Sequence, residues 1–230
     1  YYQIARCFRD EDLRSDRQPE FTQLDVELAF ATEEKIIDLT EKLFHKIFKD
    51  IFSVNDVVFN KMTYEDAMEN YGCDKPDLRN PLKMISIKED IKDTKFKVFS
   101  DPANTQDGKV VALRVPGGNK LSRKDIDVLT EMLKEFGAKG LAYLKCDDIN
   151  DISEGITSPI KKFLDDEIVK KIIEKTNAEN GDIIFFSADN KDVVNLSMSC
   201  LIKELGKQLN LLSDEWKFLW ITDYPLFERQ

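Results

Sequence analysis

Side chains that could bind a ligand lie on one face of a strand predicted near the start of the sequence. From residue 21 onward two kinds of residue alternate strictly, so successive side chains point to opposite sides. One side carries a ring, an amide and two carboxylates: Phe21, Gln23, Asp25 and Glu27. The other side is apolar: Leu24, Val26 and Leu28. We therefore expect a core face and a ligand face, the layout of a nucleotide-binding hairpin whose ring stacks on adenine and whose carboxylate holds an ammonium group.

A highly charged loop connects this strand to a preceding one, so residues 1–30 are predicted to form a strand, a loop and a strand. Acidic and basic side chains follow one another through the loop: Arg9, Asp10, Glu11, Asp12, Arg14, Asp16, Arg17 and Glu20. Gln18 and Pro19 stand just before the second strand. Charges that compensate one another in this way are typical of a solvated hairpin loop. The order of the residues favours a ligand site instead.

That order, FRDEDLRSDRQPEFTQLD at residues 8–25, closely resembles motif 2 of the class II aminoacyl-tRNA synthetases, and in particular of the bacterial aspartyl-tRNA synthetases. Later runs resemble other parts of the same enzymes: MTYEDAMENYGCDKPDLRNP at 62–81, ALRVPGGNKLSRKDID at 112–127, GAKGLAYLK at 137–145, GDIIFFSADNK at 181–191 and WITDYPLFE at 220–228. The resemblance covers essentially the whole chain. It implies a ligase that activates L-aspartate with ATP and passes the aspartyl group to tRNA.

The resemblance also implies a role for each side chain of the hairpin. Arg9 would be the catalytic residue that bridges the aspartate α-carboxylate and the α-phosphate, because a guanidinium donates parallel hydrogen bonds. The residues that match the ATP site are Arg9, Asp10, Glu11, Gln18 and Phe21, with the ring of Phe21 beneath adenine. Those that match the aspartate site are Gln23 and Asp25. The carboxylate of Asp25 would receive the α-ammonium group of the substrate.

Three further side chains of the hairpin receive weaker assignments. Glu27 continues the ligand face and would help to hold Mg²⁺. Arg14 and Arg17 match the loop tip that meets the acceptor end of tRNA. Surface ion pairs with Asp12 and Asp16 are an equally good explanation for these two arginines.

The resemblance implies an α+β fold, namely part of the antiparallel catalytic sheet of a class II synthetase with an inserted compact α/β domain. The expected division is residues 1–95 and 206–230 for the catalytic domain and 96–205 for the insertion domain. Motifs 1 and 3 of the family are absent from these residues, so we expect an internal segment of a longer homodimeric enzyme, inactive when isolated. The alternatives are a non-catalytic insertion module that binds tRNA or a partner protein, and a nucleotide-binding regulator.

Periodicity and capping residues predict the secondary structure. Helices are expected at 33–52, 122–136, 158–175 and 191–209, and strands near 56–60, 96–100, 110–115, 141–146, 182–187 and 216–221. Thr32 is the expected N-cap of the first helix, and Ser122 with Asp125 forms a capping-box pair for the second. Gly137 is expected to end that second helix, and Ser158-Pro159 to begin the third.

Composition fits a cytoplasmic globular protein, because 42% of the residues are apolar, 34% are charged, and no apolar run approaches the roughly 20 residues of a membrane helix. The four cysteines are far apart in sequence, which argues against a zinc site or a disulfide framework. His45 is the only histidine, so a site built from several imidazoles is excluded. The net charge of −10 argues mildly against a large RNA-binding surface.

Two short runs contain residues that are typical of turns. Pro116-Gly117-Gly118-Asn119 lacks the lysine and hydroxyl residues of a P-loop, so we expect a turn between a strand and a helix. The run DKPDLR at residues 74–79 has paired charges and turn residues, and the sequence assigns it no role.

Overall fold

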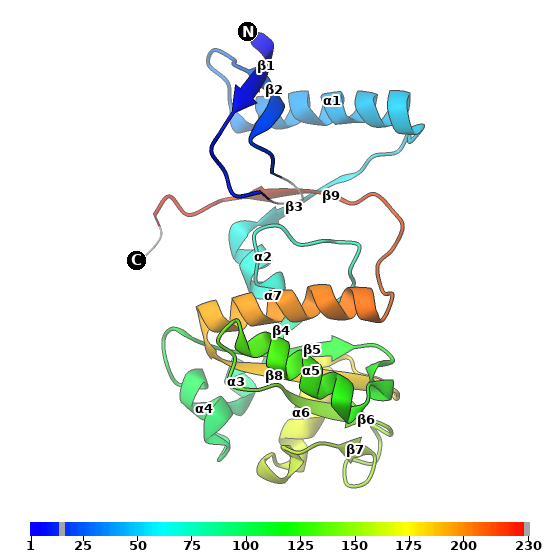
Figure 1. Cartoon of the computed structure of the whole chain (residues 1–230). Helices are drawn as coiled ribbons and strands as arrows, with labels where there is room; N and C mark the ends of the chain where they lie inside the picture. The colour runs from blue at the N-terminus through cyan, green and yellow to red at the C-terminus, as the bar shows by residue number, and fades with distance from the viewer. Residues whose placement is uncertain (14–16, 228–230) are drawn as a thin grey trace. The chain divides into compact units, whose positions relative to one another are not determined.

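The computed structural model describes residues 1–13 and 17–227, which form two compact units, Tyr1–Val57 and Val58–Gln230 (Figure 1). Each unit mixes helices with strands. The predicted α+β class, with an antiparallel sheet, is confirmed. None of the described helices is long and apolar enough to cross a membrane.

The first unit contains a hairpin and one long helix. Strands β1 (Tyr2–Phe8) and β2 (Glu20–Val26) pair antiparallel, and α1 spans Glu33–Phe52. Thr32 occupies the N-cap position with extended backbone, as predicted, and two glutamates in the first turn complement the positive end of the helix dipole. The hairpin and this helix were predicted from sequence, and both are confirmed.

The apolar face of the hairpin is not a core in this structure, which corrects the sequence-based prediction. Leu24, Val26 and Leu28 remain 48%, 45% and 42% exposed. Their alternation does place Leu24 and Val26 opposite the polar row. No described element covers them enough to exclude water, because a two-stranded ribbon has no second layer of its own.

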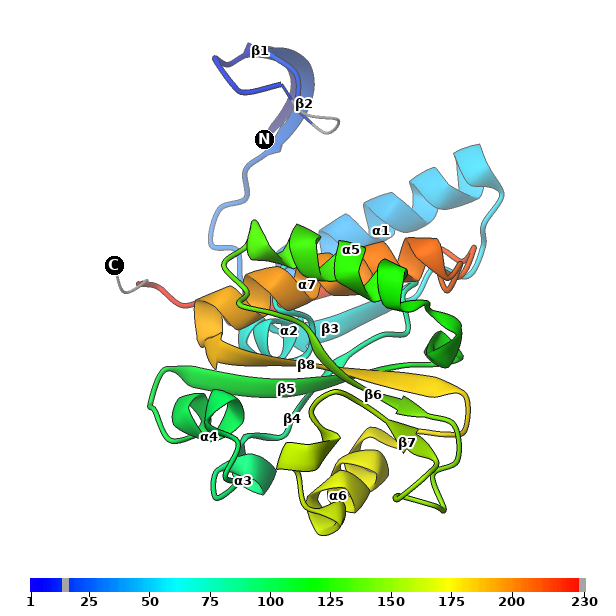
Figure 2. The same ribbon diagram turned by 60° about the horizontal axis from the view of Figure 1, so that its bottom comes forward.

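The second unit is organised around a five-stranded sheet in which every neighbouring pair is antiparallel (Figure 2). The spatial order is β4 (Met84–Ser86), β5 (Gly108–Val115), β8 (Asp182–Asn190), β6 (Ala142–Cys146) and β7 (Ile156–Thr157). Strand β5 is buried along nearly its whole length, and β8 is buried from Asp182 to Phe186. A sheet buried on both faces requires cover on both sides.

Helices supply that cover (Figure 2). On one face lie α5 (Arg123–Lys134) and α7 (Lys191–Gln208); on the other lie α3 (Lys88–Ile91), α4 (Lys97–Ala103) and α6 (Asp166–Thr176). Side chains of β8 alternate between the two cores, so that Phe185 packs with α5 and α7 while Phe186 packs with α4 and α6. Both rings are at most 1% exposed.

A second, smaller sheet pairs segments far apart in the sequence. Strand β3 (Phe59–Thr63) runs parallel to β9 (Phe218–Thr222), and helix α2 (Tyr64–Tyr71) follows β3 directly. Thr63 caps α2 by accepting a hydrogen bond from the Asp66 amide at 3.0 Å. The predicted strands near 56–60 and 216–221 are confirmed with small shifts of their bounds.

Two predicted elements differ from the structure. The predicted strand 96–100 is helix α4, because Phe96, Phe99 and Ala103 follow helical spacing and Phe99 and Ala103 are buried against the sheet. The helix predicted from Ser158 begins only at Asp166. The Ser158 hydroxyl donates to the Tyr143 carbonyl at 2.5 Å and accepts from an amide two residues on, so it holds a turn instead of capping the long helix.

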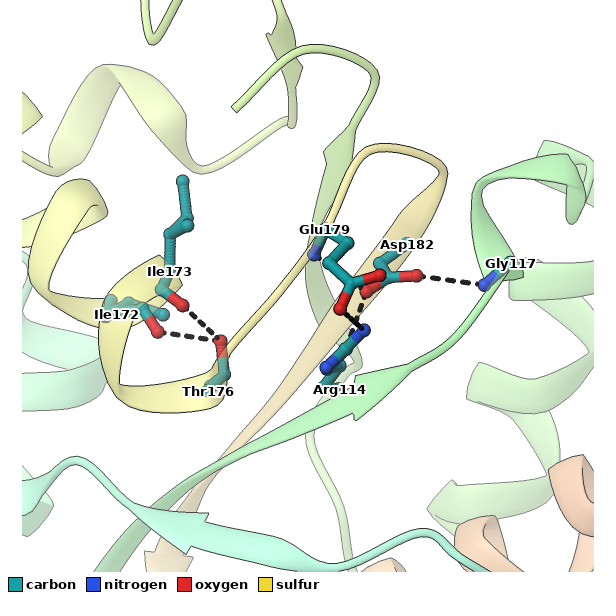
Figure 3. Close-up of polar contacts among 7 residues, drawn as sticks. All are labelled: Arg114, Gly117, Ile172, Ile173, Thr176, Glu179 and Asp182. Carbon is teal, nitrogen blue, oxygen red and sulfur yellow. Dashed lines mark hydrogen bonds and ion pairs between the residues drawn. The ribbon is translucent and has the colours of Figure 1, made fainter. Parts of the chain in front are cut away.

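The turn that follows β5 has a structural role and connects a strand to a helix, as predicted. Asp182 is 3% exposed, and its carboxylate accepts from Arg114 Nε at 2.6 Å, from the Gly117 amide at 3.0 Å and from the Glu179 amide at 2.9 Å (Figure 3). The Gly117 amide therefore has its hydrogen-bond partner within the protein. Its φ of 62° lies in the left-handed region that glycine adopts without strain. The Ser122–Asp125 capping box at the start of α5 is also confirmed.

The compact sheet of the second unit starts before the predicted domain boundary at residue 96. Strand β4 pairs with β5, and Ile87 and Ile91 are fully buried in the same core as Phe99. The division into residues 1–95, 96–205 and 206–230 stays a prediction.

Candidate active site

The side chains of the face predicted to bind a ligand lie in a row along β2 of the hairpin. Phe21, Gln23 and Asp25 are half-buried, whereas the residues between them are exposed. Glu27 lies one residue beyond the end of β2, and its backbone bonds to Tyr1 from both its amide and its carbonyl. The hairpin register therefore orders three of the four predicted side chains along one edge of a strand.

Arg9 joins this row from the end of β1. Its amide donates to the Pro19 carbonyl at 2.8 Å, which closes the base of the loop. The guanidinium carbon lies 5.1 Å from the centre of the Phe21 ring, and Nη2 is 3.5 Å from Gln23 Oε1. A cation over an aromatic face is attracted by the ring quadrupole. The side chain is nevertheless 58% exposed, so it presents its donors to solvent.

Asp25 is held by two amides. Gln23 Nε2 donates to Oδ1, and Gln3 Nε2 donates to Oδ2 at 3.4 Å. Gln3 is the direct neighbour of Asp25 across the hairpin. Sequence reasoning did not single out Gln3, although counting the antiparallel register back from Asp25 would have found it. The arrangement fixes the carboxylate while leaving its charge without a cationic partner among the described residues.

A pocket of about 420 Å³ lies at the loop end of the row. It is lined by Arg9, Glu11, Arg17, Gln18 and Phe21. The Glu11 carboxylate lies between two guanidinium groups, 3.9 Å from Arg9 Nη1 and 3.6 Å from Arg17 Nη1. Two cations, one carboxylate and a ring leave a net positive charge beside an aromatic surface, which fits an anionic group attached to a flat base.

Another predicted residue of the loop, Asp10, does not line this pocket. Asp10 is exposed directly after Arg9. Arg17 pairs with Glu11, an ion pair that was not predicted from sequence. Arg14 and Asp16, which were also expected to form surface ion pairs, lie outside the described residues.

The sequence and this geometry agree with the outcome of a comparison with known families. Residues 1–230 match the family described as tRNA synthetases class II (D, K and N), where the letters denote aspartate, lysine and asparagine. The chain belongs to this family. A class II synthetase is a ligase of protein biosynthesis that takes ATP, an amino acid and tRNA. The hairpin thus lies in a synthetase that must bring together two anions, a carboxylate and a phosphate.

Glu27 is the residue that the sequence predicts as a metal ligand. No group of three or more His, Cys, Asp or Glu side chains that could hold a metal occurs in residues 1–13 and 17–227. Mg²⁺ is commonly bound by one or two carboxylates together with substrate phosphates and water. A single carboxylate such as Glu27, which the sequence predicts as a metal ligand, fits an ion that is bound together with substrate phosphates.

Proposed function

We propose that this class II synthetase is an aspartate–tRNA ligase of the bacterial type. Support comes first from the hairpin sequence, whose run from Arg9 to Asp25 is long enough to favour the aspartate branch over those for lysine and asparagine. The observation that carries the proposal is the connected row Arg9–Gln23–Asp25 beside the Phe21 ring. It offers a cation, a carboxylate and a stacking surface in one line.

In the proposed reaction an oxygen of the aspartate α-carboxylate attacks the α-phosphorus of ATP, and pyrophosphate leaves. Arg9 donates to both the carboxylate and the α-phosphate, and so offsets their repulsion and the charge that grows on phosphorus. A hydroxyl of the terminal adenosine of tRNA then attacks the carbonyl carbon, and AMP leaves. Holding the two reactants in line provides much of the acceleration, so no side chain needs to act as general base.

The other residues of the row position the two substrates. Asp25, oriented by Gln23, accepts the α-ammonium group of aspartate, and Phe21 stacks on adenine. Arg9 and adenine cannot both occupy one face of the ring, so Arg9 rotates from the Phe21 ring towards the phosphate when ATP binds. The Arg9 side chain is 58% exposed, so it has room for this movement.

Further parts of the proposal concern the ATP phosphates, tRNA and assembly. Asp10, Glu11 and Gln18 line the path of the ATP phosphates, with Mg²⁺ bound through Glu27 and those phosphates. Arg17, with Arg14, meets the acceptor end of tRNA. The enzyme works as a homodimer. We place it in the cytoplasm, a location that the four free cysteines support.

The test is ATP–pyrophosphate exchange by the full-length protein with aspartate, asparagine and lysine offered separately. We expect exchange with aspartate at least about a hundredfold faster than with the other two. Exchange with lysine or asparagine at a comparable rate would refute the aspartate assignment. ATP binding without any amino-acid-dependent exchange would instead indicate a nucleotide-binding regulator, and residues 1–230 alone are expected to be inactive.

A further inference from the structure

The DKPDLR run, to which sequence reasoning assigned no role, forms one wall of a cavity in the second unit. The cavity has a volume of about 580 Å³, and its opposite wall is the outer surface of α7. This volume is in the range of sites that hold a small organic ligand. The cavity belongs to Val58–Gln230, whereas the hairpin belongs to Tyr1–Val57.

The loop that carries this run is fixed to α7. Asn80 donates from Nδ2 to the Ile202 carbonyl at 2.7 Å, and it accepts from the Leu82 amide at 3.1 Å. Gly206 is required at this contact, because a Cβ there would lie 2.2 Å from Asn80 Nδ2. The Ser213 amide closes the other side by donating to the Arg79 carbonyl at 3.1 Å. The wall is therefore held in place without a ligand.

The inner surface of the cavity is mainly apolar. Tyr71 lines it and is 4% exposed. Phe136 from the end of α5, Leu196 from α7 and Leu212 beyond α7 complete the apolar lining. Leu196 remains 54% exposed although it faces this cavity, so an apolar group placed here would remove it from water.

Four cations surround this apolar surface. Lys75 and Arg79 come from the DKPDLR run, and Lys203 and Lys207 come from successive turns of α7. Asp77 is the one acidic side chain that lines the cavity, and it is already paired with Arg79, with Nη2 to Oδ2 at 2.6 Å. Within residues 17–227 no carboxylate lies within 4.0 Å of the ammonium groups of the three lysines. In a chain with a net charge of −10 this is a local excess of positive charge.

Two carboxylates near the cavity reduce the local excess of positive charge without cancelling it. Glu204 and Glu135 act on the neighbouring thiol of Cys200, whose pKa is raised first by burial and then by the Glu204 charge. Neither carboxylate lines the cavity. The three lysines carry more positive charge than is needed to neutralise a singly charged carboxylate ligand. A phosphate monoester is a better match, because it carries a charge of roughly −1.5 to −2 at pH 7.

We propose that this cavity binds a phosphate monoester attached to a flat ring, with the size of a nucleoside monophosphate. The ring packs between Tyr71, Phe136 and Leu196, and the phosphate is held by Lys75 and Lys203 at the rim. This site is separate from the proposed ATP site on the hairpin, and it does not depend on the aspartate assignment.

The proposal is tested by titrating the isotope-labelled protein with AMP and following the backbone amides of residues 73–80 and 199–207 by NMR. Residue-specific signals distinguish this cavity from any binding at the hairpin. Adenosine and inorganic phosphate, added separately, supply the two halves of the ligand. We expect saturable shifts with AMP, and affinities at least about tenfold weaker for either half alone.

A charge-reversal pair provides the control. Lys203→Glu is expected to weaken AMP binding at these amides at least about fivefold, whereas Lys170→Glu on α6, on the opposite face of the sheet, leaves it unchanged. Both lysines are exposed helix residues, so both variants should fold. No saturable shift with AMP up to 10 mM, equal binding of phosphate alone, or unchanged affinity in Lys203→Glu would each overturn the proposal.

Discussion

The hairpin and the five-stranded sheet satisfy the same alternation rule with opposite results. In β2 the half-buried residues are Phe21, Gln23 and Asp25, and the apolar side remains open to solvent. In β8 every residue from Asp182 to Phe186 is buried, because helices cover both faces. The difference shows that alternation alone defines faces, and that only a second layer decides which face becomes core.

The strongest test of this comparison removes a strand from the sheet. A fragment of residues 96–205, the predicted insertion domain, lacks Leu82, Met84, Ile87 and Ile91. Each of these fully buried side chains contributes about 1.5–3 kcal/mol. We therefore expect residues 82–208 to be more stable than residues 96–205 by roughly 5 kcal/mol or more, measured by urea unfolding followed by circular dichroism.

Equal stability of the two fragments would mean that the compact domain really begins near residue 96. Residues 1–95, which contain the hairpin unit and the first part of the second unit, serve as the complementary fragment. They contain the hairpin and α1, whose apolar faces are exposed, so we expect aggregation and no cooperative transition.

Single truncations should separate the two regions in the same way. Phe186→Ala removes a ring that is 1% exposed, and the cavity left behind should cost about 3–5 kcal/mol of unfolding free energy. Leu24→Ala on the open face of the hairpin should change the stability by less than about 0.5 kcal/mol. Chemical denaturation of both variants measures the contrast, and a large loss in Leu24→Ala would reveal a covering layer over the hairpin.

Substitutions in the hairpin should reduce the rate of catalysis strongly, although they should change the free energy of unfolding little. Arg9→Ala is expected to cost about 3 kcal/mol or more in transition-state stabilisation, more than about a hundredfold in pyrophosphate exchange. Arg9→Lys should not restore activity, because an ammonium group cannot make the forked contact. Arg6→Ala, on the opposite face of the same hairpin, is the control. Exchange within tenfold of wild type for Arg9→Lys would refute the forked role.

Two smaller effects distinguish the substrates along the row. Phe21→Ala should raise mainly the KM for ATP, by about 1 kcal/mol, since stacking adds modestly to area burial. Asp25→Ala should raise mainly the KM for aspartate, by about 1.5–3 kcal/mol, because it removes a charged hydrogen-bond partner. Steady-state kinetics with each substrate varied in turn measures both. Equal changes in both KM values for both variants would show that the substrates are assigned to the wrong residues.

The last contrast is between thiols. Burial in the sheet, aided by the Asp182 and Asp147 charges, raises the pKa of Cys146 to about 11. A raised pKa leaves little thiolate below that pH, so at pH 8 Cys146 should react with iodoacetamide far more slowly than half-buried Cys7 on the hairpin. For the same reason the contribution of Cys146 to stability is present below about pH 9 and declines towards pH 11. Peptide mapping after timed alkylation measures the order, and comparable rates would contradict the burial.

Sequence reasoning succeeded where the signal is local. The helix at 33–52 combines an apolar stripe with a cap at Thr32, and the Ser122–Asp125 box marks α5 within four residues. It failed at 96–100, where a short run containing two phenylalanines fits either period. The alternation of polar and apolar side chains along β2 was also predicted, because it is set within seven residues of one strand; that the polar row binds substrates stays a prediction.

What the sequence could not reveal depends on partners far apart in the chain. Strand β4 has only three residues, and its place at the sheet edge follows from pairing with β5. Asp182 is an ordinary carboxylate in the sequence and becomes a buried anchor only through Arg114, which is 68 positions away. The cavity beside α7 likewise requires the 73–80 loop to meet a helix that begins at residue 191.

The parallel pairing of β3 with β9 has an architectural consequence. Parallel strands need a crossover connection, usually a helix, and α2 follows β3 directly to begin one. The five-stranded sheet and its helices are thus inserted in the β–α–β crossover connection, between α2 and β9. A fold built in this way can lengthen, shorten or exchange the inserted region while the two parallel strands keep their register.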